Sequence, residues 1–244
     1  MLTALRHSIR YECSTRKDVV RVLSKVLRAF SAHCEVSILA TKTSAYGMTE
    51  CVGSERSEAL QLLNDEYVVM RTTEGCDLSL IGLSCGEDTI EITSNTVDSQ
   101  QKKGYNSLLR AAAVMIAYVE KKPLRSEIAN AWSAYALLKS FQVTFIRPDG
   151  NKIVYSAPLT KEEAMEAKRD SNKGKIFVRP TIVNLDLAIQ LFTRGVRALK
   201  CAQPLAVDEE TVVAACRHPR RRVVLAHQRR KAQHPHDAGI ARAD

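Results

Sequence analysis

The hydrophobic and polar residues of the chain follow two different periods along its first 141 residues, and each period indicates one kind of element. Apolar residues three and four positions apart are typical of the buried face of a helix, whereas short β-branched runs are typical of strands. The helical period predicts helices over residues 17–30, 54–65, 108–120 and 130–141. Strands are predicted over residues 36–41, 67–72, 78–83 and 89–97, with a further short strand that begins at Leu124.

The pattern beyond Phe141 is marked by turn and cap residues. Asp149-Gly150 lies between two short apolar runs, 143–146 and 153–155, and predicts a β-hairpin. Thr160 and Glu163 have the spacing of a capping box at the head of a helix that extends through Arg169. A strand is predicted over 176–183, at an edge or a bulge because Pro180 interrupts it, and Asn184 is predicted to cap the helix that follows.

The order of these elements predicts an α+β fold. The strands at 78–83 and Thr89 are close enough to form a hairpin, whereas the later strand–helix–strand unit requires a parallel crossover. The fold class is therefore a mixed β-sheet with helices on both faces, followed by a C-terminal helix and a basic tail. We predict a core over 1–147, an extension over 148–216 that completes the sheet, and a disordered tail over 217–244.

The stretch between the strand at 89–97 and the helix at 108–120 has the composition of an anion site. It is a polar turn with one glycine, Gly104, and with Lys102 and Lys103 beside it. The first amides of a helix have no acceptor within the helix, and a glycine lets an anion approach them closely. The alternative is a surface turn that is merely basic.

The same turn, Gln101-Lys-Lys-Gly104-Tyr-Asn106, resembles the cofactor motif of the GCN5-related N-acetyltransferase (GNAT) superfamily: Gln or Arg, two residues, Gly, one residue, then Gly or Ala. The run from Asn130 to Phe141 resembles the family's second motif, an Asn-headed helix. The resemblance covers roughly residues 17–147. It implies a centrally splayed sheet and acetyl-CoA bound by backbone amides, and hence transfer of an acetyl group to an amine. The residues that it implies for cofactor binding are Gln101, Lys102, Lys103, Gly104, Tyr105, Asn106, Ser107 and Asn130.

The chain departs from the family's pattern at two positions. Asn106 stands where the family prefers Gly or Ala, and Leu137 stands where many members carry a tyrosine that protonates the leaving thiolate. Tyr135, two residues away, is the remaining candidate for this role, with packing in the core as its alternative. Glu91, on the strand before the turn, is the candidate base, and a solvated strand carboxylate is the alternative.

Composition excludes several other classes of protein. The seven cysteines are scattered without Cys-x-x-Cys spacing, so we expect no metal and a reducing compartment. No apolar run approaches the ~20 residues of a membrane span, so no membrane partner is expected. These features favour a cytoplasmic protein, and the acid-free basic start leaves a mitochondrial presequence as an alternative. A homo-oligomer is left open.

The positive charge is concentrated at the end of the chain. Residues 217–244 contain eight Arg or Lys and two Asp, a net +6 of the +9 of the whole chain. Such a cluster can bind phosphates, or it can be a solvated terminus. A second hypothesis therefore stands beside the acetyltransferase: a non-catalytic GNAT-like structural or binding protein whose basic tail contacts nucleic acid or an acidic protein partner.

Overall fold

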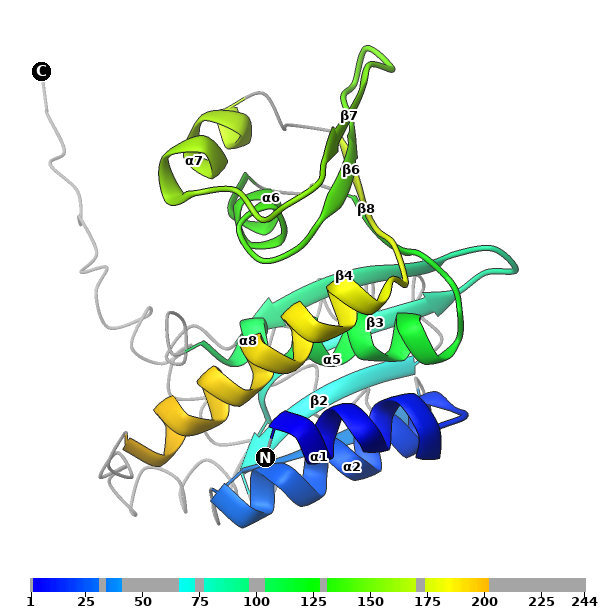
Figure 1. Cartoon of the computed structure of the whole chain (residues 1–244), viewed down its shortest axis with the longest axis vertical. Coiled ribbons are helices and arrows are strands. Elements are labelled where there is room, and N and C mark those ends of the chain that lie inside the picture. The colour runs from blue at the N-terminus through cyan, green and yellow to red at the C-terminus, as the bar shows by residue number, and fades with distance from the viewer. Residues whose placement is uncertain are drawn as a thin grey trace, which may run out of the picture. The chain divides into compact units, whose positions relative to one another are not determined.

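A mixed β-sheet forms the centre of the part of the chain that the structure, a computed structural model, describes (Figure 1). The described residues are 2–30, 34–40, 66–72, 77–96, 104–127, 131–169 and 174–201. They belong to one unit, Met1–Cys201, and the second unit, Ala202–Asp244, lies outside them. The helix expected over 54–65 and the basic tail also lie outside the described residues.

The sheet has eight strands in the order β1-β2-β3-β4-β5-β8-β6-β7. Their bounds are β1 Cys34–Ala40, β2 Glu66–Thr72, β3 Asp77–Cys85, β4 Ile90–Thr96, β5 Leu124–Glu127, β6 Val143–Ile146, β7 Lys152–Tyr155 and β8 Lys175–Val178. All neighbours are antiparallel except β4 and β5, which are parallel. The predicted fold class, an α+β fold built on a mixed sheet with helices, is confirmed.

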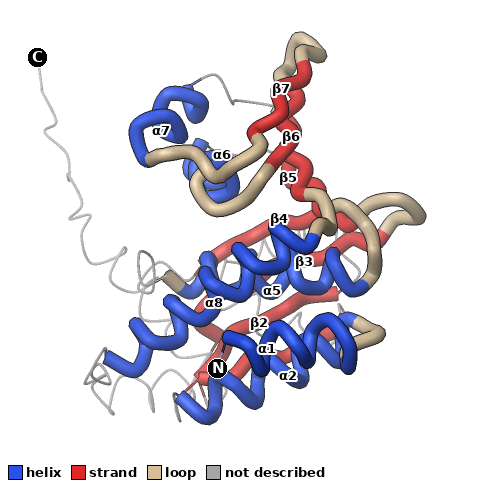
Figure 2. Tube along the Cα trace, in the orientation of Figure 1, coloured by secondary structure: helices blue, strands red, loops and turns tan. Residues whose placement is uncertain are grey.

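The parallel pair β4–β5 is joined by helix α5, Tyr105–Val119, which is the most deeply buried helix of the described chain. Every residue from Leu108 to Ala117 is buried. α5 packs against β2, β3 and β4 on one side and is covered by α2 (Arg16–Phe30) and α8 (Ile182–Cys201) (Figure 2). Because strands cover one face of α5 and helices cover others, the sequence of α5 is apolar almost all round.

The capping box predicted for α7 (Lys161–Arg169) is confirmed by its hydrogen bonds, and α2 begins with the same arrangement. In α2, the Asp18 amide donates to the Thr15 hydroxyl and the Thr15 amide donates to the Asp18 carboxylate, over 3.2 and 3.0 Å. In α7, Thr160 and Glu163 exchange the same pair of bonds. The predicted hairpin is also confirmed: β6 and β7 flank the turn at Gly150, whose φ of +86° favours glycine.

The N-terminus and the start of α8 differ from the predictions. Leu2–His7 forms α1 and Ser8–Glu12 forms the π-helix η1, neither of which the apolar pattern indicated. The strand predicted over 176–183 ends at Val178, and β8 is an interior strand rather than an edge. The physical reason is that Pro180 follows the strand instead of interrupting it, so β8 loses no ladder bond.

Asn184 is not the cap of α8, contrary to the prediction. The cap is Thr181, whose hydroxyl accepts the Asn184 amide at 3.2 Å. The side chain of Asn184 is buried and instead bonds the amide and carbonyl of Gln142 and the carbonyl of Arg179. It thereby ties the start of α8 to the connection that follows α6, Ala131–Leu138.

Candidate functional site

The turn before α5 has the backbone geometry expected of an anion site. Gly104 is the residue before the first helical residue, with φ +84° and ψ −1°, and no side chain caps the helix there. A methyl group placed on Gly104 would meet no atom of the described residues within 4 Å, so they leave the space beside this glycine open. The first turn of α5 contains no acidic residue that would compete with an anion for the helix dipole.

Several of the predicted cofactor-binding residues lie outside the described residues: Gln101, Lys102, Lys103 and Asn130. Gly104 is exposed, and Tyr105, Asn106 and Ser107 are half-buried in the first turn of α5. Asn106, at the position where the resemblance expects a small residue, therefore adds a side chain close to the opening amides.

The carboxyl ends of β4 and β5 lie at the same edge of the sheet as the start of α5, because α5 is the crossover between these parallel strands. Among the described residues, the two strands pair at Ile90–Leu124, Glu91–Arg125 and Ile92–Ser126. Beyond Ile92, β4 keeps its pairing to β3 as far as Thr96, whereas Glu127 of β5 pairs with Lys175 of β8. The described parallel ladder thus ends early, on the edge where ligands bind in open α/β sheets.

Glu91, the candidate base, is half-exposed and forms an ion pair across this ladder. Its Oε1 lies 2.5 Å from Nη1 of Arg125, and the two side chains are 43% and 24% exposed. The pair follows from the register, since Glu91 and Arg125 are opposite each other on the face away from Ile90 and Ile92. Sequence reasoning missed Arg125, and only the register between strands 34 residues apart could reveal it.

Tyr135 lies on α6 and is half-buried against the core. The ammonium nitrogen of Lys139, one turn later, lies 5.7 Å from the centre of its ring, which is within the range of a cation–π contact. Leu137 is fully buried. In the described part of the chain, Glu91 forms its ion pair with Arg125.

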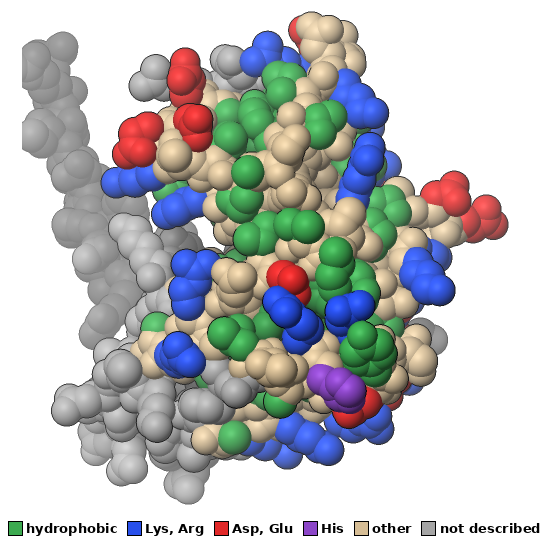
Figure 3. Space-filling view, in the orientation of Figure 1, with side chains coloured by type: hydrophobic (Ala, Val, Ile, Leu, Met, Phe, Trp, Pro, Cys, Tyr) green, Lys and Arg blue, Asp and Glu red, His purple; other side chains and the backbone are tan. Residues whose placement is uncertain are grey.

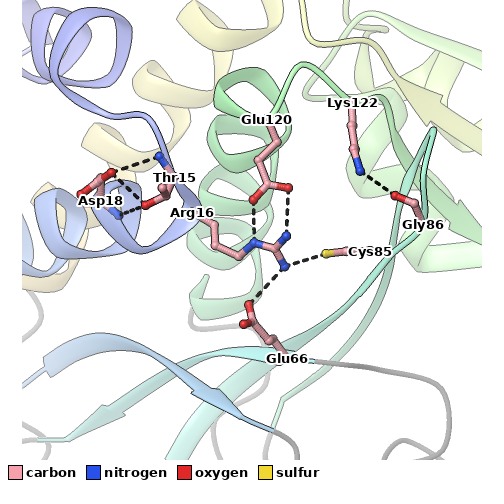
Figure 4. Close-up of polar contacts among 8 residues, drawn as sticks. All are labelled: Thr15, Arg16, Asp18, Glu66, Cys85, Gly86, Glu120 and Lys122. Carbon is pink, nitrogen blue, oxygen red and sulfur yellow. Dashed lines mark hydrogen bonds and ion pairs between the residues drawn. The ribbon is translucent and has the colours of Figure 1, made fainter.

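A second polar cluster lies at the other end of α5 (Figure 4). Arg16, the first residue of α2, donates to both carboxylate oxygens of Glu120, which caps the C-terminus of α5, over 2.6 and 3.1 Å. Its Nη1 also lies 3.2 Å from Glu66 of β2 and 2.7 Å from the sulfur of Cys85 in β3. The cluster joins the ends of four elements, which is the arrangement of a structural junction.

The chemistry of this cluster does not favour a nucleophilic cysteine. Burial raises the pKa of the Cys85 thiol, and the nearby Arg16 guanidinium opposes that effect only in part. The pKa of Cys13 is raised as well, first by burial and then by Asp18 and Glu12. A thiol whose pKa is raised is a poor nucleophile at neutral pH.

Among the described residues, no group of three or more His, Cys, Asp or Glu side chains could hold a metal ion. None of the described helices combines the length and apolarity needed to cross a membrane. On the face drawn in Figure 3, the described Lys and Arg side chains alternate with hydrophobic ones instead of gathering in one stripe.

Comparison with known proteins does not identify a family for this chain. No protein-family model matches the chain, and no curated protein matches it. Among solved structures, it is similar to a chimera of the spermidine N-acetyltransferase SpeG from Vibrio cholerae and hSSAT, with 11% sequence identity and a TM-score of 0.37. That similarity covers 61% of this chain and 96% of the other, and it is too weak to show a shared fold or function.

Proposed function

We propose that the chain is an acyl-CoA-dependent N-acyltransferase that moves an acetyl group from acetyl-CoA to an amine. The observation that carries the proposal is Gly104: a left-handed residue with open space beside it, directly before the buried helix α5 and at the edge where the β4–β5 ladder ends. The diphosphate of CoA would accept hydrogen bonds from the amides of Tyr105, Asn106 and Ser107, with Gln101, Lys102, Lys103 and Asn130 as further contacts.

The transfer forms one C–N bond and breaks one C–S bond. The amine nitrogen attacks the thioester carbonyl, and CoA leaves as a thiolate. An ammonium acceptor loses two protons: one neutralises the thiolate, and the other passes to a base and then to water. Glu91 is the base in this proposal, and Tyr135 is the proton donor to sulfur. Glu91 can serve as the base once the acceptor has displaced Arg125 from it.

The test is calorimetric titration of the full chain with acetyl-CoA, repeated on Gly104→Glu. A carboxylate beside the opening amides would repel the diphosphate and occupy its space, so we expect binding to weaken at least tenfold. Gly150→Glu is the matched control, because Gly150 has nearly the same φ, +86°, and equally open space, but lies in the β6–β7 hairpin. The control should bind acetyl-CoA as the unaltered protein does.

Two results would contradict this proposal. Absence of acetyl-CoA binding by the unaltered protein would remove the cofactor and with it the reaction. Equal loss of binding in both glutamate variants would mean that strain at a left-handed residue, rather than the position of Gly104, causes the effect.

A second function is favoured by the surroundings of the candidate catalytic residues. The carboxylate of Glu91 is already paired with Arg125, and Leu137 fills the position that the resemblance associates with a tyrosine. These observations suit a non-catalytic binding protein in which residues 217–244 contact nucleic acid or an acidic partner.

The test of this second function is a triple substitution in the basic tail, in which Arg220, Arg221 and Arg222 are changed together to Gln. This variant should bind duplex DNA more weakly, and its binding should depend less on salt concentration. Unchanged affinity would end that hypothesis.

A further inference from the structure

The ion pair of Glu91 and Arg125 is a site with two opposite charges side by side. The carboxylate and guanidinium are 2.5 Å apart and both are partly open to solvent. They face each other one residue pair before the β4–β5 ladder ends. Any acceptor that reaches the carboxylate of Glu91 therefore meets the guanidinium of Arg125 at the same time.

This pairing discriminates between kinds of amine. A simple amine can replace Arg125 as the partner of Glu91, but it offers no acceptor to the guanidinium, which is 24% exposed. Replacing the guanidinium–carboxylate pair with the amine–carboxylate contact alone loses a charge-assisted hydrogen bond that is not regained. An acceptor that brings a carboxylate next to its amine compensates both residues, since guanidinium and carboxylate form well-matched hydrogen bonds.

We propose that the acceptor is a free α-amino acid, whose ammonium group binds Glu91 and whose carboxylate binds Arg125. The inference rests on the proposed acetyltransferase function and names its class of acceptor. Arg125 is then a specificity-determining residue that holds the carboxylate of the acceptor. Because an α-amino acid bears both charges on one carbon, it can insert between the two side chains and replace each one's partner with its own group.

The reaction on such an acceptor balances as follows. The α-nitrogen forms the amide bond as the thioester C–S bond breaks, and of the two protons that the ammonium loses, one goes to the CoA sulfur and one through Glu91 to water. The carboxylate of the acceptor takes no part in the bond changes. Its contribution is to binding, so loss of Arg125 should raise KM far more than it lowers kcat.

The first measurement compares matched acceptors on the full chain, with release of the CoA thiol from acetyl-CoA as the readout. Each pair differs by one carboxylate: lysine and cadaverine, ornithine and putrescine, phenylalanine and phenethylamine. We expect kcat/KM to be at least tenfold higher for the amino acid in at least one pair, with no pair in which the decarboxylated amine is preferred. Acetyl-CoA binding, measured separately, decides whether the proposed function itself holds.

The second measurement uses variants. Arg125→Gln should raise KM for the amino acid at least tenfold and leave acetyl-CoA affinity unchanged. It should not raise KM for the matching amine, which gains nothing from the guanidinium and no longer has to displace it from Glu91. Arg125→Lys should recover part of the loss, because it restores the charge without the planar fork. Glu91→Gln should lower kcat for both kinds of acceptor. Arg21→Gln is the control for removing an arginine from an ion pair, since Arg21 pairs with Asp18 at 2.7 Å on the surface of α2.

Three outcomes would overturn the inference while leaving cofactor binding intact: preference for the decarboxylated amines, equal losses for both acceptors in Arg125→Gln, or acetyl-CoA binding without acetylation of any amino acid tested. Should Arg125→Gln unfold, the milder Arg125→Lys and the acceptor preference of the unaltered protein still decide the question.

Discussion

Two buried polar side chains of α8, Asn184 and Thr193, have opposite effects on the stability of the fold. The amide group of Asn184 makes three hydrogen bonds, two to Gln142 and one to Arg179, and is buried. The side chain of Thr193 is 2% exposed, and in the described part of the chain its hydroxyl has no hydrogen-bond partner. A satisfied buried group stabilises the fold, whereas an unsatisfied one destabilises it.

We therefore expect opposite results from removing the two polar groups. Asn184→Ala should lower the free energy of unfolding by about 2–4 kcal/mol, because it leaves the part-buried amide and carbonyl of Gln142 without these partners. Thr193→Val replaces the hydroxyl with a methyl of similar size and should change stability by less than about 0.5 kcal/mol or increase it by about 1 kcal/mol. Urea unfolding of both variants checks this, and a larger loss in Thr193→Val than in Asn184→Ala would contradict it.

Among the secondary-structure elements, the caps of two helices contain carboxylates that make the stability of the protein depend on pH. The hydrogen bond from the Thr15 hydroxyl lowers the pKa of Asp18 below its usual value, with help from the Ser14 and Thr15 amides. In α7, the Thr160 amide and then its hydroxyl lower the pKa of Glu163. Both carboxylates lie in the first turn of a helix, where their negative charge also suits the dipole.

Because both pKa values are depressed in the folded state, these carboxylates stabilise the fold fully above their unfolded pKa values of about 4. The stabilisation should disappear as the pH falls through the lower, folded values. The urea midpoint should thus decrease between pH 6 and pH 3. The double variant Thr15→Val with Thr160→Val should show a smaller decrease, and an identical decrease would show that other groups cause it.

Helices α5 and α8 pack closely against each other at Gly195. A methyl group on Gly195 of α8 would lie 2.5 Å from Cδ2 and 2.8 Å from Cγ of Leu108, which is buried in α5. The glycine is therefore present because the two helices approach too closely for a side chain.

Gly195→Ala should destabilise the protein by about 1–2 kcal/mol. The displacement of Leu108 costs more than the roughly 1 kcal/mol that alanine contributes over glycine in a helix. In a Leu108→Ala background the clash is absent, so the same change should increase stability. A double-mutant cycle measured by urea unfolding gives the coupling, and a coupling near zero would contradict the packing argument.

The Arg16 junction acts at the scale of the whole described molecule, because it connects α2, β2, β3 and α5 at one end of the sheet. Burial alone would lower the pKa of Arg16, but the hydrogen bond to Glu120, the sulfur of Cys85 and both carboxylates raise it, so the guanidinium stays charged. With 22% of its side chain exposed, Arg16 is largely shielded from solvent.

Arg16→Met should therefore lower the free energy of unfolding by about 2–3 kcal/mol, since it leaves Glu120 and Glu66 without their counter-charge. Arg21→Met is the control: its pair with Asp18 is on the surface, with Arg21 65% exposed, and should contribute about 0–1 kcal/mol. Chemical denaturation measures both, and equal losses would show that Arg16 is not a junction.

The sequence predicted most elements correctly where the signal was local. The apolar faces of α2 and α5, the capping box of α7 and the hairpin at Gly150 depend on residues a few positions apart, so periodicity and short motifs reveal them. What it could not predict depends on pairing between distant segments. The Glu91–Arg125 pair and the bonds of Asn184 arise only when strands and connections far apart in sequence meet.

The interior position of β8 has a consequence for how the protein is made. β8 lies between β5 and β6, although it is the last of the described strands along the chain. During synthesis, β5 and β6 emerge from the ribosome first, and each presents a row of unsatisfied backbone groups until residue 178 has followed. Open strand edges of this kind invite association between chains. A nascent polypeptide arrested before β8 should thus require a chaperone, and its release without one should yield aggregates.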